Sequence, residues 1–186
     1  MSTTVRITAP ANVAPLRKLY LVRFVFAVVW AALVLAVGKS IGPATVTLLV
    51  LYPLFDVAAA VVDFRSSSTA RPTVGLVITM LLSGLAAIGL GVAAGSGVPA
   101  VLRVWGVWAV TAGLVQLLVA TGRYRLGGQW AVILSGGISV LAGAGFYLMA
   151  GGADAKLRGV AGYATLGGIF FLVSALRLGR AQTTDQ

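Results

Sequence analysis

Six long apolar runs limit what this chain can fold into more than any other feature of its sequence. Each run has close to the 20 residues that an α-helix needs to cross a bilayer. They occupy residues 19–37, 43–62, 73–94, 98–120, 129–150 and 157–178. Backbone groups in lipid need internal hydrogen bonds, and the runs do not alternate polar with apolar residues, so they predict helices rather than strands. The sequence therefore predicts an all-α integral membrane protein, a six-transmembrane-helix bundle.

The composition argues against a soluble domain. Of the 186 residues, 59% are hydrophobic and 10% are charged, whereas soluble domains carry about 25% charged residues. The net charge of +10 comes from basic residues placed singly or in pairs between the apolar runs. Nucleic-acid binding needs clustered basic residues on a polar face, so we expect no nucleic-acid partner. The expected partners are membrane lipids, with anionic headgroups on the cytoplasmic side.

The basic residues predict the orientation of the spans. One side carries nine of them and the other side four, so the positive-inside rule places both termini in the cytoplasm. The richer side has Arg6, Arg17, Lys18, Arg65, Arg71, Arg123, Arg125, Arg177 and Arg180, and the other side has Lys39, Arg103, Lys156 and Arg158. We expect residues 1–18 and 179–186 to be cytoplasmic tails around a single membrane domain, residues 19–178. The first eighteen residues show no cleavage pattern, so the first span is expected to stay as an anchor.

The sequence repeats a two-helix hairpin three times, over roughly residues 19–65, 72–125 and 129–180. Without a gap, "LLSGLAAIGLGVAAGSG" superposes on "ILSGGISVLAGAGFYLMAGG", and "VLRVWGVWAVTAGL" superposes on "KLRGVAGYATLGGI". The second alignment places Trp108 on Tyr163, and extending it backwards brings in Tyr52 from the first copy. Repeats with two helices each enter the membrane in the same sense. The prediction is a bundle of three parallel hairpin repeats.

Small residues at every fourth position indicate the faces where helices pack. They let helix backbones approach closely. In lipid this close packing matters, because burying apolar side chains between helices gives no hydrophobic driving force there. The two longest stripes are Ser83, Ala87, Gly91 and Gly95 on the third span, and Ser135, Ser139 and Gly143 on the fifth. Most of this set is expected to pack within the bundle. Gly91 and Gly95 form a GxxxG pair, which is the best candidate for contact in a homo-oligomer.

One carboxylate, Asp56, lies inside an apolar run. A charge at the centre of a lipid-exposed helix costs about 2.5–3.5 kcal/mol, so Asp56 is expected to face the interior and to have a partner. Arg23 on the first span lies at a similar depth, which makes an Arg23–Asp56 ion pair the leading hypothesis. Three alternatives stay open: Arg23 reaches back to the headgroups, Asp56 is protonated and hydrogen-bonded, or another group is the partner.

Two further sets of polar residues are candidates for a site. Gln116 reaches the depth of Asp56 and Arg23, which predicts an intramembrane polar layer of these three residues. It would act either as interhelical hydrogen bonding or as a proton or ligand site. At the opposite ends of the helices we expect an outer interface of charges and aromatic rings. That interface comprises Arg103, Arg158, Trp105, Trp108 and Tyr163.

Enzyme signatures are mostly excluded. The chain has no Cys and no His, which removes thiol nucleophiles, imidazole bases and the usual transition-metal ligands. Asp56 and Asp63 are seven residues apart on one helix, too far to share a Mg²⁺ ion. We therefore expect no metal, no cofactor and no catalytic residue. Acid catalysis by Asp56 on a lipophilic substrate is the one enzymatic alternative that remains.

Residues 107–151, "VWAVTAGLVQLLVATGRYRLGGQWAVILSGGISVLAGAGFYLMAG", resemble the HdeD-like family of small bacterial six-helix membrane proteins. The shared elements are an aromatic-rich helix, a basic loop, Gly-Gln-Trp, Leu-Ser-Gly and a glycine-spaced helix. The resemblance implies a compact six-helix protein with a link to acid resistance. Since the enzyme signatures are mostly excluded, the leading prediction is a non-enzymatic protein of the bacterial inner membrane, involved in envelope or acid-stress resistance. A small transporter or channel for protons or a small solute, running through the layer around Asp56, is the alternative.

Overall fold

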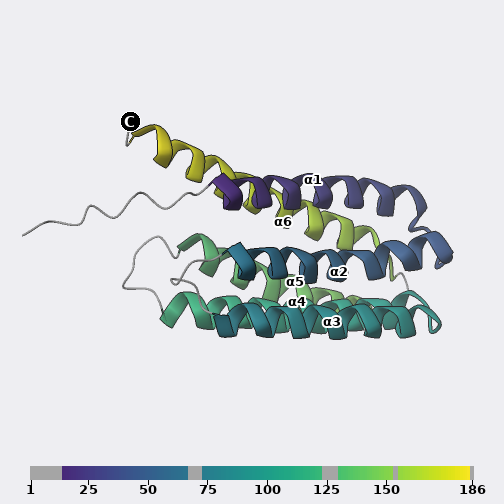
Figure 1. Cartoon of the computed structure of the whole chain (residues 1–186). Coiled ribbons are helices and arrows are strands. Elements are labelled where there is room, and N and C mark those ends of the chain that lie inside the picture. Colours follow the sequence, from purple (N-terminus) through teal and green to yellow (C-terminus); the bar gives the residue numbers. More distant parts are fainter. Residues whose placement is uncertain (1–13, 67–72, 123–129, 153–154, 185–186) are drawn as a thin grey trace, which may run out of the picture.

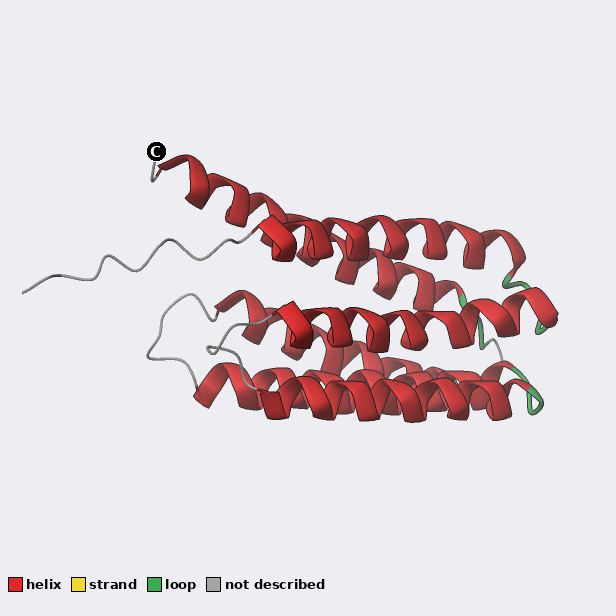
Figure 2. Ribbon diagram, in the orientation of Figure 1, coloured by secondary structure: helices red, strands yellow, loops and turns green. Residues whose placement is uncertain are grey.

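The structure, a computed structural model, describes residues 14–66, 73–122, 130–152 and 155–184. Within these ranges the chain forms six α-helices and no strand (Figures 1 and 2). They are α1 (Ala14–Val37), α2 (Pro43–Ser66), α3 (Thr73–Ala94), α4 (Val98–Gly122), α5 (Trp130–Met149) and α6 (Arg158–Thr184). All six are long and apolar enough to cross a membrane, which fits a multi-pass membrane protein.

The helix boundaries match the predicted spans most closely where glycine ends a run. The α1 helix ends at Val37, and the amide of Gly38 closes its last turn on the carbonyl of Val34. Between α3 and α4 the turn contains Gly97 with a φ of 88°, a left-handed conformation that glycine adopts without steric cost. The outer ends differ from the prediction, because α1 begins five residues early and α6 runs to Thr184. Arg and Lys favour helix as well as most apolar residues do, so polarity alone does not end these helices.

The six helices form a closed ring. Each described helix packs against its two neighbours in sequence, and α6 packs against α1. The start of α1 and the end of α6 consequently lie at the same end of the bundle (Figure 1). The closest pairs are α4 with α5, α1 with α6, and α2 with α3. Helices that share a predicted hairpin are therefore not the closest partners.

Glycines explain why α4 and α5 approach so closely. A Cβ atom at Gly143 would lie 2.6 Å from the carbonyl oxygen of Gly106, and one at Gly113 would lie 2.6 Å from that of Gly136. These two backbone contacts place the helices closer than any side chain on those faces would allow. The predicted stripe residues Ser139 and Gly143 are buried, whereas Ser135 is half-buried.

The small-residue stripe on α3 is buried at its start and exposed at its end. Ser83 and Ala87 are buried, but Gly91 and Gly95 are exposed, and Gly91 meets α2 only through ordinary contact with Val50. With 3.6 residues per turn, an every-fourth-residue stripe drifts around the helix, and the buried line continues instead through Leu90 and Ala94. Gly91 and Gly95 thus lie on the outer surface. Their contact in a homo-oligomer stays a prediction.

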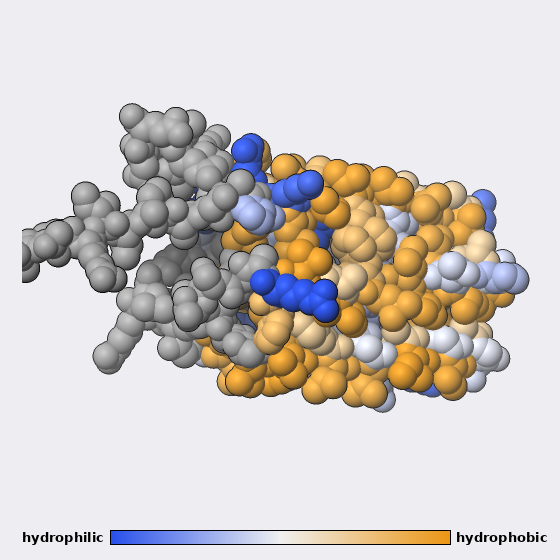
Figure 3. All heavy atoms as spheres, viewed as in Figure 1, coloured by the Kyte–Doolittle hydropathy of each residue, from blue (hydrophilic) through white to orange (hydrophobic). Residues whose placement is uncertain are grey.

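The outside of the bundle is apolar over most of the face seen in Figure 3. Large aliphatic side chains point outward along the helices, among them Leu81, Leu85, Ile88 and Val92 on α3. An exposed apolar surface of this size suits lipid and would be a liability in water.

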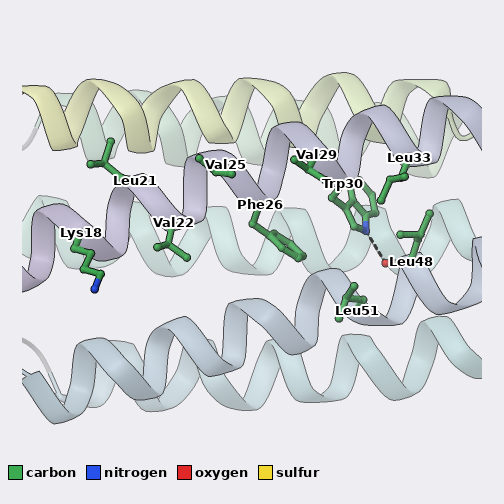
Figure 4. Close-up of a pocket in the computed structure, with 10 residues that line it drawn as sticks. All are labelled: Lys18, Leu21, Val22, Val25, Phe26, Val29, Trp30, Leu33, Leu48 and Leu51. Atoms are coloured by element: carbon green, nitrogen blue, oxygen red, sulfur yellow. Dashed lines mark hydrogen bonds between the residues drawn. The ribbon is translucent and has the colours of Figure 1, made fainter.

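Aromatic rings fill the interior of the ring of helices. Trp30, Tyr52, Trp105 and Trp108 contact one another with ring centroids 4.5–6.1 Å apart. The indole N–H of Trp30 donates to the carbonyl of Leu48 at 2.6 Å (Figure 4). Pro53 has no N–H to donate to the carbonyl of Leu49. The hydrogen bond from Trp30 to the adjacent carbonyl of Leu48 therefore lies beside the point where the backbone bonding of α2 is interrupted.

Candidate functional site: the Asp56 network

The carboxylate of Asp56 is engaged at both oxygens. Arg23 on α1 donates to Oδ1, and the hydroxyl of Ser83 on α3 donates to Oδ2 at 2.7 Å. The side chains of Arg23 and Asp56 are 16% and 18% exposed, so most of the pair is enclosed by protein. The carboxylate of Asp56 therefore has a charged partner and a hydrogen-bond donor, as an ionised group in an apolar interior requires.

Ser83 extends the network to a fourth helix. Its oxygen accepts a hydrogen bond from the indole N–H of Trp108 on α4, at 3.2 Å. Ser83 is 1% exposed and Trp108 is 8% exposed. The hydroxyl thus accepts from α4 and donates to α2 at the same time. We refer to Arg23, Asp56, Ser83 and Trp108 as the Asp56 network.

Arg23 also connects the network to α6. Its guanidinium carbon lies 4.4 Å from the ring centroid of Phe171, a cation–π distance. Phe171 packs against Tyr20 as well, with centroids 5.8 Å apart. The Asp56 network and Phe171 therefore join α1, α2, α3, α4 and α6 through polar contacts at one level of the bundle.

Matching depths bring these residues together. Asp56 lies ten residues before Ser66, where α2 ends, and Ser83 lies ten residues after Thr73, where α3 begins. At 1.5 Å per residue both are about 15 Å from the same end of the bundle. The sequence predicts a role in helix packing alone for Ser83. The shared depth was a signal that could have identified it as a partner of Asp56.

Gln116 does not join Asp56 and Arg23, although the sequence predicted a layer of all three. It lies on α4 at the crossing with α5, where its Cβ would be 3.2 Å from a Cβ built on Gly136. Its Oε1 atom is buried and has no hydrogen-bond partner among the described residues. The close glycine contacts of α4 with α5 direct Gln116 toward α5 instead of toward α2.

The aromatic residues predicted for the outer interface lie inside the bundle. Trp105 is 0% exposed and Trp108 belongs to the same buried cluster. Tyr163 packs against that cluster and donates to the hydroxyl of Ser139 at 3.0 Å. These rings lie at least one turn inside the ends of their helices, on the faces that meet neighbouring helices. Arg103 and Arg158 are both exposed, Arg158 at the first residue of α6 and Arg103 five residues after the start of α4.

The chemistry open to this arrangement is limited by its hydrogen bonds. Both oxygens of Asp56 already accept a hydrogen bond from the protein, which leaves the carboxylate only part of its acceptor capacity for another group. Among the described residues no group of three or more His, Cys, Asp or Glu could hold a metal ion. What the network can do is hold four helices together through one ion pair and two further hydrogen bonds.

Replacement of Ser83 by alanine tests the link between α3 and α4. Ser83→Ala leaves the indole N–H of Trp108 buried without an acceptor and Asp56 without one donor, so we expect a loss of about 1–3 kcal/mol in unfolding free energy. Thr121→Ala is the matched control, because the Thr121 hydroxyl is exposed and bonds only carbonyls of its own helix. Unfolding in mixed detergent micelles measures both. Equal losses in the two variants would show that the Ser83 hydroxyl connects nothing.

No protein-family model, no curated protein and no solved structure matches the chain. The function of the site is therefore inferred from its geometry.

Proposed function

We propose that this chain is a non-enzymatic, multi-pass protein of a bacterial inner membrane, of the HdeD-like type, which acts in resistance to acid or envelope stress. The observation that carries the proposal is the Asp56 network, in which one ionisable carboxylate joins the polar contacts of four helices. Both of its oxygens are engaged, which favours a role in holding the bundle over a role in catalysis.

Acid acts directly on such a network. Protonation of Asp56 removes the charge that Arg23 pairs with, and leaves the guanidinium enclosed without a counter-ion. Arg23 from α1 is the charged group that faces Asp56. Loss of this ion pair would weaken the contact between α1 and α2, and a helix contact that depends on an ionisable group suits a protein of the acid response.

The proposed fold consists of three parallel hairpin repeats with both termini in the cytoplasm. Close helix pairs alternate around the ring with looser pairs, the looser ones lying within the hairpins, which supports a threefold pattern. Two aligned positions also behave alike, because Trp108 and Tyr163 each donate to a serine of the preceding helix. The charge bias between the two sides supports the orientation.

Cell survival tests the proposal. Deletion of the gene in the bacterium that encodes this chain is expected to reduce survival of an acid challenge, and the wild-type gene should restore it. The variant Arg23→Leu/Asp56→Leu, which keeps the interior filled but has no titratable group there, should not restore it. Restoration by this double variant would contradict a role for Asp56 in the acid response.

A small proton or solute transporter is the second candidate. The observation that favours it is the residual exposure of Arg23 and Asp56, which shows that the pair is not fully sealed by protein. Proton flux into liposomes separates the two functions. Flux that depends on the purified protein and disappears in Asp56→Asn would establish transport, whereas liposomes that stay tight favour the stress role.

A further inference from the structure

An open groove lies on the outer face of the bundle, along the line where α1 meets α2. It has a volume of about 520 Å³. It is lined by Lys18, Leu21, Val22, Val25, Phe26, Val29, Trp30, Leu33, Leu48 and Leu51 (Figure 4). Lys18 is the single charged residue among them, and it lies at one end. The groove is therefore apolar along its length, with one cationic side chain at its end.

The inner wall of the groove consists of side chains held in place by their contacts, and its outer edge is exposed. Trp30 is 1% exposed and is held by its hydrogen bond to Leu48, and Phe26 stacks on Phe55 with centroids 3.7 Å apart. The rim includes Val25 and Val29, which are 56% and 53% exposed. Because α1 is a candidate membrane span, whatever occupies this groove comes from the lipid phase or from another chain in it.

The length of the groove matches a lipid chain. From Lys18 to Leu33 it extends along fifteen residues of α1, or about 22 Å at 1.5 Å per residue. One leaflet contributes about 15 Å to the hydrocarbon core of a bilayer. A complete acyl chain of the leaflet next to Lys18 therefore fits along the groove, with its headgroup beside the ammonium group.

We propose that the α1–α2 groove binds one anionic phospholipid, with an acyl chain against Phe26 and Trp30 and the lipid phosphate paired with Lys18. The distribution of charge supports this occupant, since an anionic headgroup on an apolar chain is the complement of a cation at the end of an apolar groove. A second copy of this chain would have to bring its own anionic group to Lys18, and carboxylates are scarce in this sequence, with four in all.

The proposed lipid would reinforce the seam beside the Asp56 network. Phe26 and Trp30 lie on α1 between the groove and the interior, and Phe55, the stacking partner of Phe26, directly precedes Asp56. α1 and α2 are among the more loosely packed neighbours in the ring. An acyl chain that fills the groove would cover the contact between α1 and α2 from outside. Lipid binding is therefore expected to stabilise the whole bundle.

Lipid titration in detergent tests the proposal. The full chain, in micelles of an uncharged detergent, is titrated with dioleoyl phosphatidylglycerol or with dioleoyl phosphatidylcholine, and bound lipid is counted by native mass spectrometry while the unfolding temperature is followed. We expect one tightly bound phosphatidylglycerol and a higher unfolding temperature. Phosphatidylcholine should bind more weakly, and glycerol phosphate without acyl chains should have no effect.

Three variants locate the site. Lys18→Gln should weaken phosphatidylglycerol binding about fivefold, the effect of one basic residue near a membrane surface. Arg17→Gln and Lys39→Gln are matched controls, because both residues are exposed on or just after α1 but do not line the groove. They should bind as the wild type does. All three changes are at the surface, so none should prevent folding.

A fourth variant fills the groove. Val29→Trp, at an exposed rim position, should abolish the tight binding of phosphatidylglycerol and the weaker binding of phosphatidylcholine. Equal losses in Lys18→Gln and Arg17→Gln would overturn the proposal, because they would indicate general attraction by surface charge. Tight lipid binding that persists in Val29→Trp would also overturn it. So would a dimer that Val29→Trp dissociates, since the groove would then hold a second copy.

Discussion

Asp56→Ala is expected to lower the free energy of unfolding by about 3 kcal/mol or more, because it leaves the guanidinium of Arg23 enclosed without its counter-ion. Arg23→Ala should have a similar effect through Asp56, although Ser83 would still donate to the carboxylate. The side chains of the pair are less than one-fifth exposed, so water can replace little of what is lost. Unfolding by SDS in mixed micelles, followed by circular dichroism, measures these losses.

The double variant Arg23→Leu/Asp56→Leu is the decisive comparison. Apolar residues of similar volume often replace a buried ion pair with little cost, so the double variant should be more stable than either single variant. Arg103→Gln, a change at an exposed cation on α4, is the control and should stay within about 0.5 kcal/mol of the wild type. A double variant that loses the sum of the two single losses would mean that Arg23 and Asp56 are not coupled.

Gly143→Ala is the second change with a large expected effect. Its new Cβ atom would lie 2.6 Å from the carbonyl oxygen of Gly106 and 2.8 Å from the amide nitrogen of Val110. Both are backbone atoms of α4, so the helices must separate, and overpacking of this kind costs about 1–3 kcal/mol. The same unfolding experiment measures it.

Gly145→Ala supplies the control two residues along the same helix. A Cβ atom at Gly145 meets nothing within 4 Å, and alanine favours helix more than glycine does. We expect no loss of stability in this variant. If both variants lost equal stability, glycine would matter in α5 for reasons other than its contact with α4.

The number and position of the helices could be predicted because the membrane imposes a length on each apolar run. The six predicted spans correspond to the six helices, and the start of α3 at Thr73 agrees to the residue. The choice of closest partners could not be predicted from short loops. It depends on which glycines face each other, as Gly106 and Gly143 do, and that needs the rotation of each helix.

The candidate site could be predicted in part. The cost of an intramembrane carboxylate and the shared depth of Arg23 and Asp56 led to the pair that the structure contains. The sequence predicts other roles for Ser83 and Trp108, because a serine in a small-residue stripe indicates helix packing and a tryptophan near a helix end indicates the membrane interface. Gln116 matched the others in depth, but depth does not specify which neighbouring helix a side chain faces.

The packing of α1 against α6 has a consequence for how the protein is made. These two helices come from opposite ends of the chain, and chains are synthesised from the N-terminus at about 5–20 residues per second. Because α1 is synthesised before α6, Arg23 can contact Phe171 only after the residues of α6 have been made. The ring of six helices closes only then, so truncation anywhere before α6 leaves α1 without its main neighbour.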